Sequence, residues 1–292
     1  MRHLLKPHYV WRPVQALRRA AQLLRRPAAG PRVVTLPWGL RMRVDPEEDI
    51  GRAIWQLGLY DLTICEALWR LVSPGDTVLD VGANIGCMTG LMALRAGPAG
   101  AVRAFEPHPQ VYAELAENAA RFASGIAPIQ VDRLALSDTA GTTTLYSGDH
   151  FAHNHGLASL VAAPGPSFRV ETSTLDEVLG AGTAAVVKID VEGNEQQVVN
   201  GGLKSLREGR IRHIIYEAQP QLGSLVETTL RDAGYSVHAL GRSFFGPLLA
   251  APGETVLLPP YEAPSFLATR APDTAAARLH PRGWQILTTP HR

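Results

Sequence analysis

The stretch LDVGANIG, residues 79–86, places a carboxylate, two glycines and an amide side chain where a strand would turn into a helix. Glycines in such a turn let the backbone approach a ligand closely, and the helix that follows directs free N–H groups at it. The dinucleotide fingerprint G-x-G-x-x-G binds a pyrophosphate in this way. Here Asn84 stands at the second glycine position and Gly86 comes one residue early, so the turn favours a ligand without a pyrophosphate.

S-adenosylmethionine is a ligand of this kind, because it joins adenosine to methionine without any phosphate. Backbone groups of the turn and the carboxylate of Asp80 are suited to hold the ammonium and carboxylate groups of its methionine end. We therefore predict cofactor contacts along the turn, at Asp80, Gly82, Ala83, Asn84 and Gly86.

The ends of the next two strands offer contacts for the adenosine. Glu106 ends the expected strand 101–106 and lies 24 residues after Gly82. An acidic residue about 20 residues beyond the glycine turn typically accepts hydrogen bonds from ribose hydroxyls. NAD uses the same contact, so Glu106 alone does not distinguish the two cofactors. Backbone groups near Ala135 and Leu136 are predicted to meet the adenine ring.

The stretch VVKIDVEGNE, residues 186–195, reads as a buried strand that ends in charged residues. Carboxylates and histidines beside a bound cofactor are suited to act as a general base in its reaction. We favour Asp190 or a loop histidine as this base, with Glu192 shaping the pocket. The complete set of candidates is Asp190, Glu192, Glu217, His153 and His155.

No metal or disulfide framework is expected. His150, His153 and His155 cluster in the loop HFAHNH, but loop histidines without fixed geometry are more often solvated or turned toward substrate. Cys65 and Cys87 lie far apart and outside any Cys-x-x-Cys pattern.

Alternating strands and helices must position these residues. Strands are expected at 77–82, 101–106, 128–135, 184–191, 211–217 and 235–240, with helices at 86–96, 109–122, 195–207 and 222–233. This alternation predicts an α/β fold with a parallel sheet covered by helices on both faces. Ligands of such sheets bind beyond the carboxyl ends of the strands, where Asp80, Glu106, Asp190 and Glu217 would meet.

The two ends of the chain read differently from its middle. Residues 1–45 form a basic segment with an amphipathic helix over 10–26 and a hairpin over 33–44, and residues 46–260 form the main domain. We expect residues 261–292, rich in proline and alanine, to be a loosely attached tail. For the helix we favour packing on the main domain or a frayed leader; the alternative is docking onto an anionic membrane surface or onto a partner.

Charge and hydropathy exclude several classes of protein. The net charge of +1 argues against a dedicated nucleic-acid binder, although residues 1–44 hold ten basic residues and no acidic one. No apolar run reaches the roughly 18 to 20 residues that span a bilayer, and no signal peptide is recognised. We expect a cytoplasmic protein, with peripheral contact at the inner face of the membrane as the alternative. The sequence does not indicate an oligomeric state.

The chain resembles the FkbM family of S-adenosylmethionine-dependent methyltransferases over about residues 50–240. The matching motifs, in the order of the family, are GDTVLDVGANIG (75–86), AFEPHPQVYAELAEN (104–118), ALSDTAG (135–141), TLDEVL (174–179), VVKIDVEGNE (186–195) and IIYEA (214–218). The chain departs from the family at Cys87, where an aromatic residue often follows GANIG, and at Asp61, where the family commonly has glutamate.

The resemblance implies a Rossmann-like fold with a seven-stranded sheet and an antiparallel last strand, for which ETVLLPP at 254–260 is the candidate. It implies that Lys188, Asp190, Glu192 and Glu195 form the acidic motif of the family at the end of a strand. It also implies O-methylation of a hydroxyl on a glycan or glycolipid sugar, or on a polyketide-type metabolite. The alternatives are an NAD-dependent oxidoreductase and a non-catalytic cofactor-binding module associated with a membrane.

Overall fold

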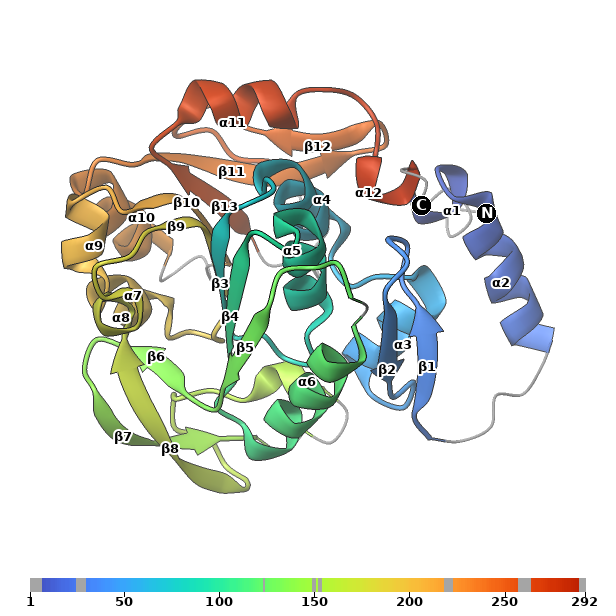
Figure 1. Cartoon of the computed structure of the whole chain (residues 1–292), viewed down its shortest axis with the longest axis horizontal. Helices are drawn as coiled ribbons and strands as arrows, with labels where there is room; N and C mark the ends of the chain where they lie inside the picture. The colour runs from blue at the N-terminus through green and yellow to red at the C-terminus, as the bar shows by residue number, and fades with distance from the viewer. Residues whose placement is uncertain are drawn as a thin grey trace.

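An eight-stranded sheet forms the centre of the fold (Figure 1). The computed structural model describes residues 7–24, 30–122, 124–148, 151, 154–217, 223–256 and 264–288. Across the sheet the strand order is β12 (Gly246–Leu249), β11 (Ser236–Ser243), β13 (Ser265–Thr269), β10 (Ile211–Glu217), β9 (Ala184–Ile189), β3 (Thr77–Val81), β4 (Ala101–Phe105) and β5 (Ile129–Asp132). The five strands from β10 to β5 are parallel, which confirms the predicted α/β class.

Alternate residues of these strands enter two separate cores. Val78 and Val186 pack with α4 (Leu62–Leu71), α5 (Cys87–Ala96) and α6 (Pro109–Arg121) on one face. Their neighbours Leu79 and Val187 point to the other face, because successive side chains of a strand alternate. That face is covered by α7 (Leu175–Leu179), α8 (Glu195–Asn200), α9 (Leu203–Arg207) and α10 (Gly223–Asp232). Burial on both faces explains the uninterrupted apolar runs of the strands.

The antiparallel strand of the sheet lies further along the chain than expected. β13 inserts between β10 and β11 and is antiparallel to both, and its Leu267 and Ala268 are fully buried. The prediction that ETVLLPP forms this strand is wrong at 254–256, which are irregular, while 257–260 lie outside the described residues. β12 adds an eighth strand beyond the seven that were predicted.

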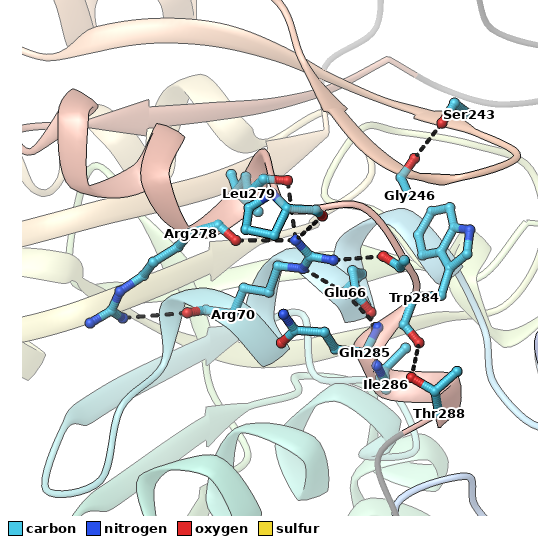
Figure 2. A network of polar contacts seen from close by, with 12 residues as sticks. Glu66, Arg70, Ser243, Gly246, Arg278, Leu279, Trp284, Gln285, Ile286 and Thr288 are labelled. Carbon is cyan, nitrogen blue, oxygen red and sulfur yellow. Dashed lines mark hydrogen bonds and ion pairs between the residues drawn. The ribbon is translucent and has the colours of Figure 1, made fainter.

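The prediction of a loosely attached tail is also wrong for residues 264–288. After β13 come α11 (Pro272–Leu279) and α12 (Gln285–Thr288), whose Leu279 and Ile286 enter the core with α4. A buried ion pair of α4, Arg70 Nε to Glu66 Oε1 at 2.6 Å, anchors them (Figure 2). The guanidinium donates to carbonyls, and the carboxylate accepts backbone N–H groups, along one segment: Arg278, Leu279, Pro281, Gly283, Gln285 and Ile286.

The predicted hairpin near the N-terminus is confirmed as β1 (Arg32–Thr35) paired with β2 (Arg41–Val44). Its Trp38 and Met42 enter the main core. Asn118 of α6 also holds it, accepting from the backbone N–H of Arg43 at 2.7 Å and donating to the carbonyl of Arg43 at 3.1 Å. The expected boundary at residue 45 is therefore wrong, since the hairpin belongs to the domain.

Before the hairpin, the sequence predicts one helix over 10–26, whereas the structure has two, α1 (Pro7–Val10) and α2 (Pro13–Leu24). Residues 25 and 26 of the predicted helix lie outside the described ranges. Among the described helices, none is long and apolar enough to cross a membrane.

A three-stranded sheet flanks the carboxyl end of β5. The chain leaves the main sheet at Asp132, and β6 (Ala135–Ser137) then pairs in parallel with β8 (Ser167–Thr174). β7 (Gly141–Tyr146) pairs antiparallel with β8 and not with β6. The sheet places Ala135 and Leu136 beside the strand ends that carry the predicted site.

Candidate active site

A cavity lies at the carboxyl ends of β3, β4, β9 and β10. It brings together most of the residues predicted from the sequence: Gly82, Ala83, Asn84, Glu106, Ala135, Leu136, His155, Asp190, Glu192 and Glu217. Asp80 and Gly86 are not among the residues that line it, and His153 lies outside the described residues.

The glycine turn at the start of the cavity requires its first glycine. Gly82 has φ +75°, and a Cβ atom there would lie 1.8 Å from the backbone oxygen of Asp190. The turn after β3 thus lies directly against the end of β9. Gly86, with φ +92°, is needed for a different contact, since its Cβ would lie 2.8 Å from Leu115 of α6. Gly86 serves helix packing, which differs from its expected contact with a ligand.

Glu106 is held by the backbone on both sides. Its Oε2 accepts from the N–H of Asn84 at 3.0 Å, and its Oε1 accepts from the N–H of His108 at 2.9 Å. Burial raises the pKa of Glu106 to about 7, although these two hydrogen bonds favour the ionised form. Each carboxylate oxygen can accept a second hydrogen bond, so both oxygens retain capacity for ligand hydroxyls.

Lys188 joins the turn to the carboxylates at the end of β9. Its Nζ donates to the carbonyl of Gly82 at 2.6 Å and lies 3.5 Å from Asp80 Oδ1 and 3.4 Å from Asp190 Oδ2. Burial disfavours its charge, but the attraction of Asp190 and Asp80 outweighs burial and raises the pKa of Lys188. Lys188 is therefore paired with Asp190.

Asp80 is fully buried behind this lysine. Its Oδ2 accepts from the hydroxyl of Thr89 at 2.6 Å. The structure therefore differs from the expectation that Asp80 contacts the ligand, and Asp80 acts on the cavity through Lys188.

Three carboxyl groups gather at the other end of the cavity, on Asp190, Glu192 and Glu217. Burial, followed by repulsion from Asp190 and Asp61, raises the pKa of Glu217 to about 9. Glu192 is exposed at the rim of the cavity, where partial desolvation, together with repulsion from Asp190 and Glu195, raises its pKa to about 7. Glu192 and Glu217 therefore differ in pKa, so they lose their protons at different pH.

The turn that carries Glu192 is fixed by hydrogen bonds. Glu192 has φ +50°, and its carbonyl accepts from the hydroxyl of Ser159 at 2.7 Å. Glu195 accepts from the N–H groups of Val191 and Gly193, so it supports the turn and does not line the cavity. Asn194 donates to the carbonyl of Leu136 at 3.1 Å, which ties this turn to the predicted adenine side.

Tyr60 is a cavity residue that the sequence analysis missed. It lies between α3 (Asp49–Leu57) and α4, where Asp61 adopts φ +45° and its side chain accepts from the N–H of Ile64 at 2.9 Å. Cys65 donates to the carbonyl of Tyr60 at 3.1 Å. The motif GLYD, residues 58–61, could have indicated Tyr60, because its Asp61 caps the start of α4 and so fixes the position of the residue before it.

His155 is the one predicted histidine within the described residues that lines the cavity. Its backbone N–H donates to Glu48 at 3.1 Å, and its ring stacks on Phe151 with centroids 4.9 Å apart. In the described part of the chain, no group of three histidine, cysteine or acidic side chains is arranged to hold a metal ion.

The charges around the cavity favour a cationic ligand. Among the described residues that line it, four carboxyl groups, on Glu106, Asp190, Glu192 and Glu217, face one ammonium group, on Lys188. Lys188 is already engaged by Asp80, Asp190 and Gly82. A pyrophosphate would meet repulsion here, whereas a sulfonium or ammonium group would be attracted.

Comparison with known proteins agrees with this geometry. Residues 80–237 match the methyltransferase FkbM domain family. The 31-O-demethyl-FK506 methyltransferase FkbM of Streptomyces tacrolimicus is 35% identical over 200 residues, which cover 57% of this chain and 75% of that protein. The hexuronic acid methyltransferase AglP of Haloferax volcanii is 29% identical over 173 residues, which cover 58% of this chain and 67% of that protein.

Among solved structures, an S-adenosylmethionine-dependent O-methyltransferase from Thermotoga maritima matches with a TM-score of 0.45 at 11% identity, over 84% of this chain and 94% of that one.

Proposed function

The chain belongs to the FkbM family of methyltransferases, whose cofactor is S-adenosylmethionine, and we propose that it methylates a hydroxyl group of a sugar or of a polyketide-type metabolite. The two relatives support this acceptor chemistry, since one is named for 31-O-demethyl-FK506 and the other for hexuronic acid. Membership of this family excludes the alternative prediction that the chain is an NAD-dependent oxidoreductase.

The residues of the cavity fit this cofactor. The turn at Gly82 to Asn84 would hold the methionine end, Glu106 would accept from the ribose hydroxyls, and Leu136 would lie against the adenine. When bound, S-adenosylmethionine supplies an electrophilic methyl group on a positively charged sulfur. The observation that carries the proposal is the excess of carboxyl groups over ammonium groups in the same cavity. Even with Glu217 protonated, the carboxyl groups of Glu106, Asp190 and Glu192 outnumber the one ammonium group, which suits a cationic cofactor and supplies a base.

Among the carboxyl groups, we assign the role of general base to Glu192. It lies at the rim of the cavity, and a pKa of about 7 leaves it ionised in part of the molecules and able to accept a proton near neutral pH. Asp190 is engaged by Lys188 at 3.4 Å, so it positions the lysine and the glycine turn. Glu217, with a pKa of about 9, stays protonated near neutral pH and can donate a hydrogen bond to the acceptor.

A transfer assay tests the acceptor class. The purified chain is incubated with methyl-labelled S-adenosylmethionine and two panels, hydroxylated macrolides and uronic-acid glycans, and the products are located by mass spectrometry. We expect a new methyl ether on a member of one panel. Methylation only at nitrogen or carbon, or tight cofactor binding with no acceptor methylated in either panel, would contradict the proposal.

A further inference from the structure

Helix α2 presents its apolar side to solvent, which is the reverse of what a helix packed on its own domain shows. Val14 and Leu17 lie on one face, at positions i and i+3, and are 52% and 70% exposed. The side turned toward α3 carries the polar Gln15 instead, whose amide donates to the carbonyl of Gln56 at 2.9 Å. The helix thus packs on the main domain, as the favoured interpretation of the sequence has it, but through this polar side and not through its apolar face.

Two aromatic side chains from a distant segment extend this exposed surface. Phe244 and Phe245, in the turn between β11 and β12, are 38% and 58% exposed. Trp11 holds the turn beside the N-terminal helices, because its indole N–H donates to the carbonyl of Phe244 at 3.0 Å. We call Val10, Val14, Leu17, Phe244 and Phe245 the N-terminal apolar patch.

The charge around the patch is uniformly basic on the N-terminal side. Residues 1–44 hold ten basic residues and no acidic one. Arg18 is exposed beside Val14 and Leu17, and Arg12, which is half-buried, comes directly before the first residue of α2. Within the part of the chain that the structure describes, no carboxylate forms an ion pair with either arginine.

We propose that the N-terminal apolar patch docks on the surface of an anionic membrane, with the apolar side chains in the interface and the arginines against lipid headgroups. An exposed apolar face, flanking arginines and aromatic side chains are together the pattern of a helix that lies in the plane of a membrane. A neutral apolar partner would not account for the basic charge. This docking is independent of the acceptor that the enzyme methylates.

Sedimentation of the full chain with lipid vesicles tests the proposal. The chain is expected to bind vesicles that contain phosphatidylglycerol, to bind pure phosphatidylcholine vesicles much more weakly, and to lose binding as salt is raised. Leu17→Glu should reduce partitioning by about tenfold or more, because it removes a leucine that the bound state buries in the membrane and adds a negative charge that the anionic headgroups repel. Arg18→Gln should reduce it by about fivefold.

Matched controls come from surfaces on other parts of the fold. Leu225→Glu replaces a leucine that is 57% exposed on α10, and Arg169→Gln replaces an exposed arginine on β8. Both elements lie away from α2 (Figure 1). Neither control should change vesicle binding. Phe245→Ser, in a different segment, should weaken binding as Leu17→Glu does, and far-ultraviolet circular dichroism checks that every variant is folded.

Three results would overturn the proposal. The chain could fail to sediment with phosphatidylglycerol vesicles, or it could bind them equally well with and without Leu17→Glu and Phe245→Ser. It could also form a dimer in solution that Leu17→Glu converts to a monomer, in which case a second copy of the chain covers the patch.

Discussion

At the scale of single residues, Glu106 should make cofactor binding depend on pH. Its pKa is raised from 4.5 to about 7 by burial, while ribose hydroxyls favour the ionised carboxylate as an acceptor. Affinity for S-adenosylmethionine should therefore fall as the pH is lowered below about 7, approaching tenfold per pH unit. Calorimetric titrations between pH 5.5 and 8.5 measure this.

The same shift acts on stability in the opposite direction. A carboxyl group whose pKa is raised by folding stabilises the free protein below pH 4.5, and this contribution is lost as the pH rises to about 7. Glu106→Gln should remove both dependences together. If the affinity of Glu106→Gln for S-adenosylmethionine still depends on pH, a group other than Glu106 causes the dependence.

Glu192 should control the rate and not the affinity for the cofactor. Without the carboxylate the acceptor hydroxyl keeps its proton, so Glu192→Gln should lower kcat by roughly 100-fold or more. In the unmodified enzyme kcat should rise with pH and level off above about 7, because the base must be ionised. Steady-state rates across this range, with cofactor affinity measured separately, check both expectations.

Asp190→Asn provides the comparison for this experiment. Asp190 neutralises Lys188, which in turn binds the carbonyl of Gly82, so its loss should weaken cofactor binding as well as turnover. If Asp190→Asn abolishes turnover at unchanged affinity while Glu192→Gln stays active, the assignment of the base is wrong and Asp190 takes the proton.

The residues at the site were largely predictable because each ends a strand. Gly82, Glu106 and Asp190 follow apolar runs, and the carboxyl ends of parallel strands meet at one edge. The depth of a side chain was not predictable, since Asp80 belongs to the same motif yet points behind Lys188. Tyr60 was missed because its position depends on how two helices join.

At the scale of elements, the contact between the glycine turn and β9 should be indispensable. Gly82 and Gly75 both have positive φ, +75° and +87°, but only at Gly82 would a Cβ collide with a neighbour, the backbone oxygen of Asp190. Gly75→Ala should cost about 1 to 3 kcal/mol from backbone strain alone. Gly82→Ala should cost more and should also remove cofactor binding, as measured by urea unfolding and calorimetry.

Equal losses of stability in Gly82→Ala and Gly75→Ala, with cofactor binding retained in both, would show that the turn does not need to lie against β9.

The buried pair of α4 should be a major source of stability for the C-terminal elements. Glu66→Ala leaves the charge of Arg70 buried and frees the N–H groups of Gln285 and Ile286. Loss of one partner of a buried pair costs about 3 to 5 kcal/mol. Urea unfolding should show this loss, whereas Arg231→Gln, in the exposed pair with Glu227, should change stability by less than about 1 kcal/mol.

Loss of less than about 1 kcal/mol in Glu66→Ala would mean that α11 and α12 are held without the ion pair.

The C-terminal elements are the part of the fold that the sequence analysis predicted incorrectly, as a loosely attached tail. β13 is a short SFLAT run within a proline- and alanine-rich composition, so local pattern did not distinguish it from a tail. Its place between β10 and β11 is fixed by pairing with residues 25 to 33 positions earlier in β11 and 48 to 56 positions earlier in β10, and such pairing leaves no periodic signal in the segment itself. The parallel strands were predictable because burial on both faces makes each a long apolar run.

At the scale of the whole molecule, one cavity is assembled from segments between Ile50 and Glu217. The sequence placed the adenosine side and the acidic side of this cavity at the same sheet edge. It did not show that the N-terminal hairpin and the C-terminal elements share the core of the domain, because that sharing rests on contacts between segments far apart in the chain, such as those of Trp38 and Leu279 with the core and the hydrogen bond from Arg70 to Gly283.

The central claim is that this cavity binds S-adenosylmethionine at its Glu106 end and carries out proton transfer at its Glu192 end. Calorimetric titration of S-adenosylmethionine into the unmodified chain, Glu106→Ala and Glu192→Gln tests it most directly. We expect one site per chain, affinity at least about tenfold weaker in Glu106→Ala, and unchanged affinity in Glu192→Gln. Absence of binding in the unmodified chain, or equal affinity in Glu106→Ala, would contradict it.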